Sequence, residues 1–269
     1  MSRTVGVMGC GWLGLPLAEK LLKSGYKVRG TTTSTSKVEQ LELAGIKGFK
    51  IQLHENAIAG DITNFLSGLD TLIINVPPGL RGNSGSNYVS KINLLLNEIQ
   101  KAAVKNIVFV SSTSVYGSAE GEITEDTILR PETESGKQLA QSEALFQKEN
   151  NLNTAIVRFG GLIGRDRHPV NHLAGKKGLK NGDALVNLIH LEDCIQMLIT
   201  IVQKRYWRTI FNGVYPLHPT KRAYYTNEAL KRGLPPPEFE SSSSKRNKKL
   251  IISKNYLIKL NALYTSIIS

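Results

Sequence analysis

Short apolar segments alternate along the chain with longer segments whose apolar residues recur every three or four positions. The first pattern predicts buried β-strands, and the second predicts helices that bury one face. The expected strands are residues 4–8, 26–31, 46–53, 69–76, 106–111 and 153–158. The expected helices are residues 13–24, 36–44, 60–67, 86–103 and 135–149. This alternation predicts an α/β fold of β-α-β units with right-handed crossovers, and so a doubly wound parallel sheet covered on both faces.

The loop between the first strand and the first helix reads Gly-Cys-Gly-Trp-Leu-Gly over residues 9–14. In such a loop the first glycine allows a tight turn, the second lets the backbone approach a pyrophosphate, and the third lets helix and strand pack closely. Free N–H groups at the helix start attract the anion. The pattern therefore predicts a Rossmann-type sheet that binds a dinucleotide, although six such residues can also meet in a turn by chance. The residues expected to bind the coenzyme here are Gly9, Gly11, Trp12, Leu13 and Gly14.

The net charge of +12 over 269 residues raises nucleic acid as a partner. The basic residues are spread through the chain, however, and the one dense group, at residues 245–249, follows a serine run and is typical of a solvated loop. We therefore expect no nucleic-acid partner. The excess positive charge also suits an anionic coenzyme and an anionic substrate.

No stretch reaches the roughly 18 to 20 consecutive apolar residues that a membrane span requires. The first residues run directly into the first expected strand, which leaves no room for a signal peptide. We therefore expect a cytoplasmic protein without a membrane partner. Cys10 and Cys194 form neither a metal-binding spacing nor a disulfide framework, and we expect both to be reduced and no metal to be bound.

The second expected strand lacks the acidic residue that would bind the ribose hydroxyls of NAD. Residues 31–37 read Thr-Thr-Thr-Ser-Thr-Ser-Lys instead. Hydroxyls and the nearby cations Arg29 and Lys37 can donate hydrogen bonds to a 2′-phosphate, so the pattern favours NADP(H) over NAD(H). The alternative is a simple polar turn. The residues expected at the 2′-phosphate are Thr32, Thr33, Ser34 and Lys37.

A stiff loop, Asn-Val-Pro-Pro-Gly at residues 75–79, follows the fourth long strand. Its two prolines lack N–H groups, so it either lines the coenzyme through Val76 and Pro77 or merely stops the strand.

After the fifth of these strands the chain reads Ser-Ser-Thr-Ser-Val-Tyr-Gly over residues 111–117. Together with the glycine loop, and with matching segments at residues 153–164 and 186–193, this motif resembles the extended short-chain dehydrogenase/reductase superfamily, which includes the sugar-nucleotide epimerases and dehydratases. In that family the second serine of the pair, here Ser112, binds the reacting oxygen of the substrate. The resemblance makes Ser112 the foremost catalytic candidate, although its hydroxyl could instead serve the loop backbone.

The resemblance also divides the chain. It implies a Rossmann domain over residues 1–160 and a smaller α/β substrate-binding lobe over residues 161–269 that interleaves with it. In this second part we expect helices at residues 191–204 and 219–232 and a strand at residues 210–214. A further helical pattern runs through Tyr256, Leu257, Leu260 and Leu263.

The Tyr-x-x-x-Lys motif of the family is absent. There, the lysine and the nicotinamide lower the pKa of the phenol, so that it can exchange a proton during hydride transfer. If Lys137 is the motif lysine, Thr133 stands at the tyrosine position. In the alignment that we prefer, which needs no gap, Ser135 replaces the tyrosine and Leu139 the lysine. In both cases the phenol is lost. Ser112, Ser135 and Lys137 are the catalytic candidates.

His168, with Arg167 beside it after a strand, is either a contact for an anionic substrate or an ordinary loop histidine. Tyr116 and Tyr88 are better explained as packing or capping residues, and His190 as a hydrogen-bonded structural residue.

Three hypotheses follow. In the first, the chain is an NADP-dependent oxidoreductase or epimerase-like enzyme acting on a small carbonyl or sugar substrate, free or nucleotide-linked. In the second, it is a catalytically degraded NADP sensor or partner-binding protein. The third, a nucleic-acid-binding protein, is the least favoured. Similar proteins form homodimers through two long helices, so we expect a homodimer.

Overall fold

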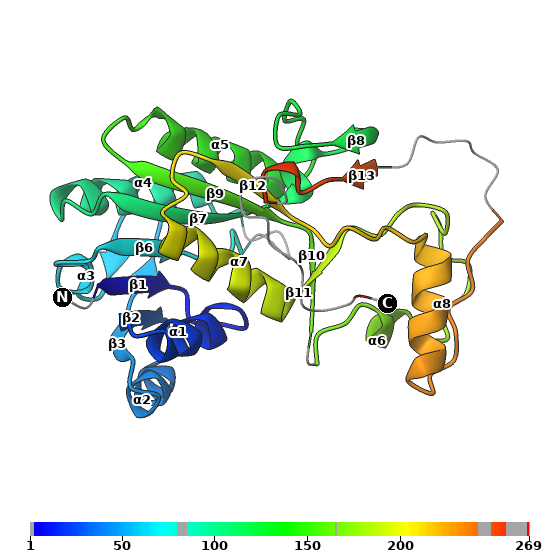
Figure 1. Ribbon diagram of the computed structural model, residues 1–269, viewed down its shortest axis with the longest axis horizontal. Coiled ribbons are helices and arrows are strands. Elements are labelled where there is room, and N and C mark those ends of the chain that lie inside the picture. The colour runs from blue at the N-terminus through cyan, green and yellow to red at the C-terminus, as the bar shows by residue number, and fades with distance from the viewer. Residues whose placement is uncertain (1–2, 80–84, 165, 242–248, 257–267, 269) are drawn as a thin grey trace.

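A seven-stranded parallel sheet forms the centre of the computed structural model, which describes residues 3–79, 85–164, 166–241, 249–256 and 268 (Figure 1). The strand order is β12-β9-β7-β6-β1-β2-β3, so the chain runs outward from β1 on one side and returns to continue on the other. This is the predicted doubly wound topology. The strands of the sheet are β1 (Thr4–Met8), β2 (Lys27–Thr32), β3 (Lys47–Lys50), β6 (Thr71–Ile74), β7 (Asn106–Ser112), β9 (Asn153–Phe159) and β12 (Ile210–Gly213).

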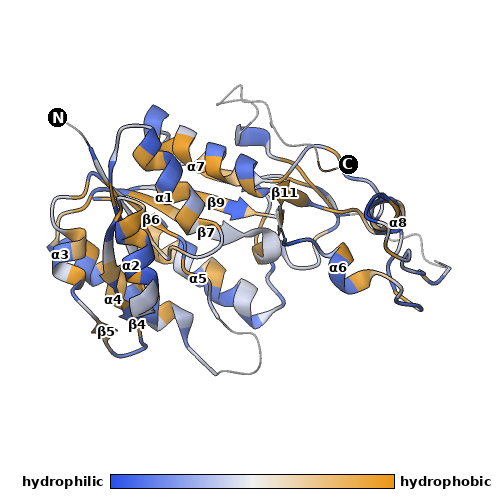
Figure 2. Ribbon diagram, turned by 90° about the horizontal axis from the view of Figure 1, so that it is seen from below, coloured by the Kyte–Doolittle hydropathy of each residue, from blue (hydrophilic) through white to orange (hydrophobic). Residues whose placement is uncertain are grey.

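Helices cover both faces of this sheet, and their apolar sides lie against it (Figure 2). On one face α1 packs beside α7, and on the other α4 packs beside α5. Alternate residues of β1 serve the two layers, because Val5 and Val7 belong to the α1 layer while Met8 belongs to the α4 layer. The helices are α1 (Gly14–Lys23), α2 (Thr35–Leu43), α3 (Ile62–Leu66), α4 (Tyr88–Lys101), α5 (Glu134–Lys148), α6 (Val170–Leu173), α7 (Leu191–Lys204) and α8 (Lys221–Lys231).

The chain after β9 divides its residues between the sheet and a smaller lobe. α7 and β12 join the main layers, whereas α6, α8 and the parallel pair β10 (Gly161–Ile163) and β11 (Leu188–His190) extend to one side (Figure 1). Beyond α8, β13 (Lys249–Ile251) returns to pair with β8 (Gly121–Ile123). The second part of the chain is therefore intertwined with the first.

Two expectations from the sequence need comment. The single strand expected at residues 46–53 is wrong, because the chain leaves β2 after Ile51 donates its N–H to the Thr32 carbonyl, at 2.9 Å. It then forms a separate antiparallel pair, β4 (Gln52–Leu53) and β5 (Ile58–Ala59). The helical pattern beyond Tyr256 lies outside the described residues, as does the basic group at residues 245–248.

No helix in the described ranges is both long and apolar enough to cross a membrane.

Candidate functional site

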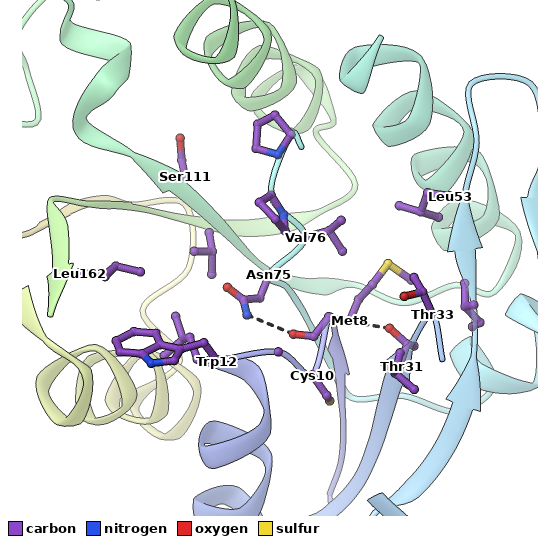
Figure 3. Close-up of a pocket in the computed structure, with 18 of the residues that line it drawn as sticks. Met8, Cys10, Trp12, Thr31, Thr33, Leu53, Asn75, Val76, Ser111 and Leu162 are labelled. Carbon is purple, nitrogen blue, oxygen red and sulfur yellow. Dashed lines mark hydrogen bonds between the residues drawn. The ribbon is translucent and has the colours of Figure 1, made fainter. Parts of the chain in front are cut away.

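A cavity of about 460 Å³ lies at the carboxyl ends of β1, β2, β6 and β7, where the strand order reverses. Figure 3 shows Thr31 and Thr33 on one side of it, Trp12 and Leu162 on the other, and Asn75 between them. Most of the predicted coenzyme residues line this cavity: Gly9, Gly11, Trp12, Leu13, Thr32, Thr33, Lys37, Val76 and Pro77.

The glycine loop has the geometry that its three glycines predict. Gly9 has a φ of +97°, and a Cβ there would lie 2.6 Å from the Asn75 carbonyl oxygen. A Cβ on Gly14 would lie 2.1 Å from the Gly9 carbonyl oxygen, so Gly14, which does not line the cavity, allows α1 to approach the loop. Around Gly11 nothing lies within 4 Å of an added Cβ, which leaves that part of the backbone open.

Three hydrogen bonds hold the loop against its neighbours. Cys10 N–H donates to the Thr31 carbonyl at 2.8 Å, and Gly9 N–H donates to Thr31 Oγ1 at 3.0 Å. Asn75 Nδ2 donates to the Gly9 carbonyl at 3.1 Å (Figure 3). The loop is therefore fixed from β2 and from the end of β6.

The amino end of α1 offers unpaired donors to this cavity. No side chain caps the helix, and its first turn carries no acidic residue. Within the described part of the chain, the N–H groups of Trp12 and Leu13 have no hydrogen-bond acceptor. Unpaired amides at a helix amino end, next to an open glycine, fit the diphosphate of a dinucleotide.

The far end of the cavity is lined by Thr32, Thr33 and Lys37 at the junction of β2 and α2. Ser34 lies at the start of α2 and is not part of the cavity wall, and its hydroxyl pairs with Ser36 Oγ at 2.8 Å. The expectation for Arg29 is wrong. Its Nη1 donates to three carbonyls at the end of α3, those of Asn64, Phe65 and Ser67, at 2.6, 3.0 and 2.7 Å.

The loop after β6 lines the cavity through Val76 and Pro77. Tyr88, the first residue of α4, donates its hydroxyl to the Val76 carbonyl at 2.8 Å and so fixes this loop. Its ring is fully buried, and burial raises the pKa of the phenol well above its usual value. Tyr88 is therefore a structural residue, as the sequence indicated.

Ser111 and Ser112, at the end of β7, both line the cavity. Successive residues of a strand face opposite sides, and the two hydroxyls make different hydrogen bonds. Ser112 Oγ accepts a hydrogen bond from Ser114 N–H at 3.2 Å, so its own hydroxyl hydrogen remains available. Ser111 is buried and donates its hydroxyl to Glu143 Oε1, at 2.5 Å.

Ser111 is attached to a buried polar network below the cavity. The Glu143 carboxylate and the Arg158 guanidinium are almost fully buried and meet at 2.7 Å. Arg158 also donates to Tyr116 Oη at 2.8 Å, and Tyr116 donates in turn to Asn212 Oδ1 at 2.8 Å. Burial raises the pKa of the Tyr116 phenol despite the nearby Arg158. Tyr116 is therefore a member of the core network and does not face the cavity.

The residues expected to replace the tyrosine and lysine lie on α5. Ser135 is half-buried in the first turn and Lys137 is exposed, and neither lines the cavity. Thr133 caps the helix by accepting from Gly136 N–H. Leu139, at the lysine position of the preferred alignment, does line the cavity. An apolar side chain therefore stands on the wall beside the serines.

The histidines lie outside the cavity. His168 is buried in the small lobe, where its Nδ1 accepts from Val170 N–H at 3.1 Å and its Nε2 lies 3.0 Å from Tyr224 Oη. His190 caps α7 by accepting from Glu192 N–H. Of the loop that suggested an anionic substrate, Arg167 alone reaches the cavity wall among the described residues.

Sequence reasoning did not assign a role to Asn75 or Ser111. The place of Asn75 directly after a buried strand could have indicated its role in the sequence. For Ser111, the indication was that two successive serines of a strand face opposite sides, so that they have different neighbours.

Comparisons with known proteins agree with this geometry. A family model described as NAD(P)H-binding matches residues 9–198. Protein YeeZ of Escherichia coli K12 is 33% identical over 250 residues, which cover 93% of this chain and 91% of YeeZ. The uncharacterized UDP-glucose epimerase YtcB of Bacillus subtilis is 24% identical, over 72% of this chain and 70% of YtcB.

Solved structures share the whole fold. UDP-glucuronic acid 4-epimerase from Bacillus cereus, solved with NAD, superposes with a TM-score of 0.81 at 19% identity, over 99% of this chain and 93% of that one. A functionally unknown conserved protein from Silicibacter pomeroyi gives a TM-score of 0.77 at 21% identity, over 98% and 94%. The chain therefore belongs to the NAD(P)H-binding family.

Proposed function

We propose that the protein is an NADP(H)-dependent oxidoreductase or epimerase-like enzyme that acts on a small carbonyl or sugar substrate, free or nucleotide-linked. The observation that carries this proposal is the single cavity wall that runs from the open amides of the glycine loop to the hydroxyl of Ser112. Bound nicotinamide would supply or accept a hydride there. The small lobe, through Leu162 and Arg167, would hold the substrate on the other side.

The choice of NADP(H) rests on the end of the cavity at β2. Thr32, Thr33 and Lys37 line it, and none of the described lining residues is acidic. α2 starts there with no acidic residue in its first turn. Hydroxyls, one cation and a helix amino end favour a 2′-phosphate, whereas the ribose hydroxyls of NAD favour a carboxylate. Because Arg29 is bound to carbonyls at the end of α3, Lys37 is the cation that we expect at the 2′-phosphate.

Ser112 would donate its hydroxyl hydrogen to the reacting oxygen of the substrate. Its backbone is fixed by β7, and one lone pair of its oxygen accepts from Ser114 N–H, so its hydroxyl hydrogen is free to turn toward the substrate. Tyr88 and Tyr116 cannot take the role of the missing phenol, since both are buried and donate to other groups. Ser135 and Lys137 do not line the cavity, so either side chain would have to move toward the substrate to transfer the proton. Otherwise a water molecule would transfer it.

The test is turnover. Purified protein is offered UDP-glucose and UDP-glucuronic acid with NADP⁺, and a panel of small aldehydes and ketones with NADPH. Nicotinamide absorbance and product formation are followed. We expect turnover with one class, and a fall in kcat/KM of about 10²-fold for Ser112→Ala. An unchanged kcat/KM in that variant would remove Ser112 from the mechanism.

A second candidate function is an NADP(H) sensor or partner-binding protein. It is favoured by one observation, the apolar Leu139 at the cavity wall where the preferred alignment places the family's lysine. This candidate predicts tight NADPH binding with no hydride transfer to any substrate. Either function accommodates a homodimer, and we propose that it forms through the long helices α4 and α5, which pack side by side.

A further inference from the structure

The cavity carries two cationic side chains and no carboxylate among its described lining residues. Lys37 lies at the end formed by β2 and α2, with Thr32 and Thr33. Arg167 comes from the small lobe and stacks on Trp12. Figure 3 shows that the Trp12 side chain extends toward Leu162 and away from Thr31 and Thr33. The two cations therefore serve opposite ends of the cavity.

The position of Arg167 is defined by backbone and ring contacts. Arg167 and Gly164 exchange both of their backbone hydrogen bonds, at 2.8 and 3.0 Å, which closes a tight turn after β10. The guanidinium carbon then lies 5.0 Å from the centroid of the Trp12 ring. That ring packs against the core cluster below it. A guanidinium stacked in this way keeps its N–H edge free for a ligand.

No described carboxylate pairs with this guanidinium, and its N–H groups have no acceptor in the described ranges. Two other arginines of the chain are used differently. Arg158 is paired with Glu143, and Arg29 is bound to backbone carbonyls. Trp12 adds a second unpaired donor, since its buried Nε1–H has no acceptor in the part of the chain that the structure describes.

We propose that Arg167 binds an anionic group of the substrate, a carboxylate or a phosphoryl group, while Ser112 contacts the reacting oxygen. This inference rests on the proposed function and names its substrate class. The diphosphate of the coenzyme is accounted for by the glycine loop and its 2′-phosphate by the Lys37 end. The remaining cation then lies on the side of the small lobe. Its planar fork can donate to two oxygens of a carboxylate or of a phosphoryl group at once.

The experiment uses the NADPH-loaded full-length protein and two matched probes, oxamate and oxamide, which differ in one negative charge and are small enough to enter beside the coenzyme. Inorganic phosphate is a third probe, and binding is measured by calorimetry at low ionic strength. We expect oxamate or phosphate to bind about tenfold or more tighter than oxamide. Oxamate tighter than phosphate assigns a carboxylate, and the reverse assigns a phosphoryl group.

Arg167→Met should abolish this preference and leave the Kd of NADPH within about twofold, and Arg167→Lys should restore part of it. Lys37→Met is the matched control and should retain the preference. Equal binding of the charged and neutral probes, no binding of either anion, or a preference that survives Arg167→Met would overturn the inference. A loss of NADPH affinity in Arg167→Met would overturn it too, by assigning the arginine to the coenzyme. Failure of the wild-type protein to bind NADPH would instead refute the proposed function.

Discussion

The side-chain amide of Asn75 donates to the backbone carbonyl of Gly9 at 3.1 Å and so ties the end of β6 to the glycine loop after β1. Because a carbonyl can only accept, this bond also fixes which end of the amide is Nδ2, and Oδ1 faces the cavity (Figure 3). The same Gly9 carbonyl oxygen would lie 2.1 Å from a Cβ on Gly14. The loop is thus packed on two sides and open at Gly11.

Because the loop is open at Gly11 and packed at Gly14, alanine substitutions at these two positions should have different effects. In Gly11→Ala the added methyl group meets no protein atom and occupies the space over the loop, so NADPH binding should weaken at least about tenfold with an unchanged melting temperature. In Gly14→Ala the methyl group would lie 2.1 Å from the Gly9 carbonyl oxygen, and the protein should lose stability by about 1–3 kcal/mol. Thermal unfolding and fluorescence titration separate the two. Equal melting temperatures in both variants would contradict the packing described for Gly14.

Lys37 should determine the choice of coenzyme. Lys37→Met removes the cation at the β2 end of the cavity, and we expect about a tenfold loss of affinity for NADPH with little change for NADH. Lys27→Met, an exposed lysine at the start of β2 outside the cavity, is the control. The two dissociation constants are measured for each variant. A parallel loss for both coenzymes would show that Lys37 does not contact a 2′-phosphate.

The ion pair between Glu143 and Arg158 should be the most sensitive polar contact of the core. Glu143→Gln leaves a buried guanidinium without its counter-charge, so we expect the free energy of unfolding to fall by about 3–5 kcal/mol. Lys101→Met breaks an exposed pair with Glu98 and should cost less than about 1 kcal/mol. Urea denaturation compares the variants. Similar losses in both would mean that the buried pair is not needed for the fold.

His168 predicts a specific acid sensitivity. Burial, helped by Arg232 and opposed by Glu228, lowers the pKa of His168 from 6.5 to about 4. The unfolded chain therefore takes up a proton below pH 6.5 that the folded chain refuses until about pH 4. Stability contributed by the neutral ring is complete above pH 6.5 and falls, by up to about 3 kcal/mol, as the pH drops to 4.

The groups that face this ring are Tyr224 Oη, Glu228, Arg232 and the N–H of Val170. His168→Gln should flatten the pH dependence of unfolding between pH 4 and 6.5. His172→Gln, an exposed histidine on α6, should leave it unchanged. A wild-type profile already flat over this range would contradict the buried neutral ring.

The parts of the fold that depend on neighbours in sequence were predictable. β1, the glycine loop and α1 follow one another within 20 residues, and their apolar spacing and glycines determine them locally. α7 has the bounds that its apolar stripe predicts. The position of Ser112 at a strand end facing the cavity followed in the same way from β7.

Contacts between distant segments were not predictable from local patterns. Arg29 was expected to bind a phosphate, but its three carbonyl partners come from residues 64–67, which no pattern near Arg29 indicates. The stacking of Arg167 on Trp12 joins the small lobe to the glycine loop across most of the chain. His168, which the sequence left open as a substrate contact or an ordinary loop histidine, is buried in the small lobe, where it bonds to Tyr224 and to Val170.

The central claim is that the amino end of α1 and the glycine loop bind the diphosphate of a nicotinamide dinucleotide. Calorimetric titration of the purified protein with NADPH and NADH tests it directly. The account predicts a saturable heat of binding with one coenzyme per chain and a lower Kd for NADPH than for NADH. This heat should be lost in Gly11→Ala while the variant stays folded. No heat from either coenzyme with folded protein, or unaltered binding by Gly11→Ala, would contradict it.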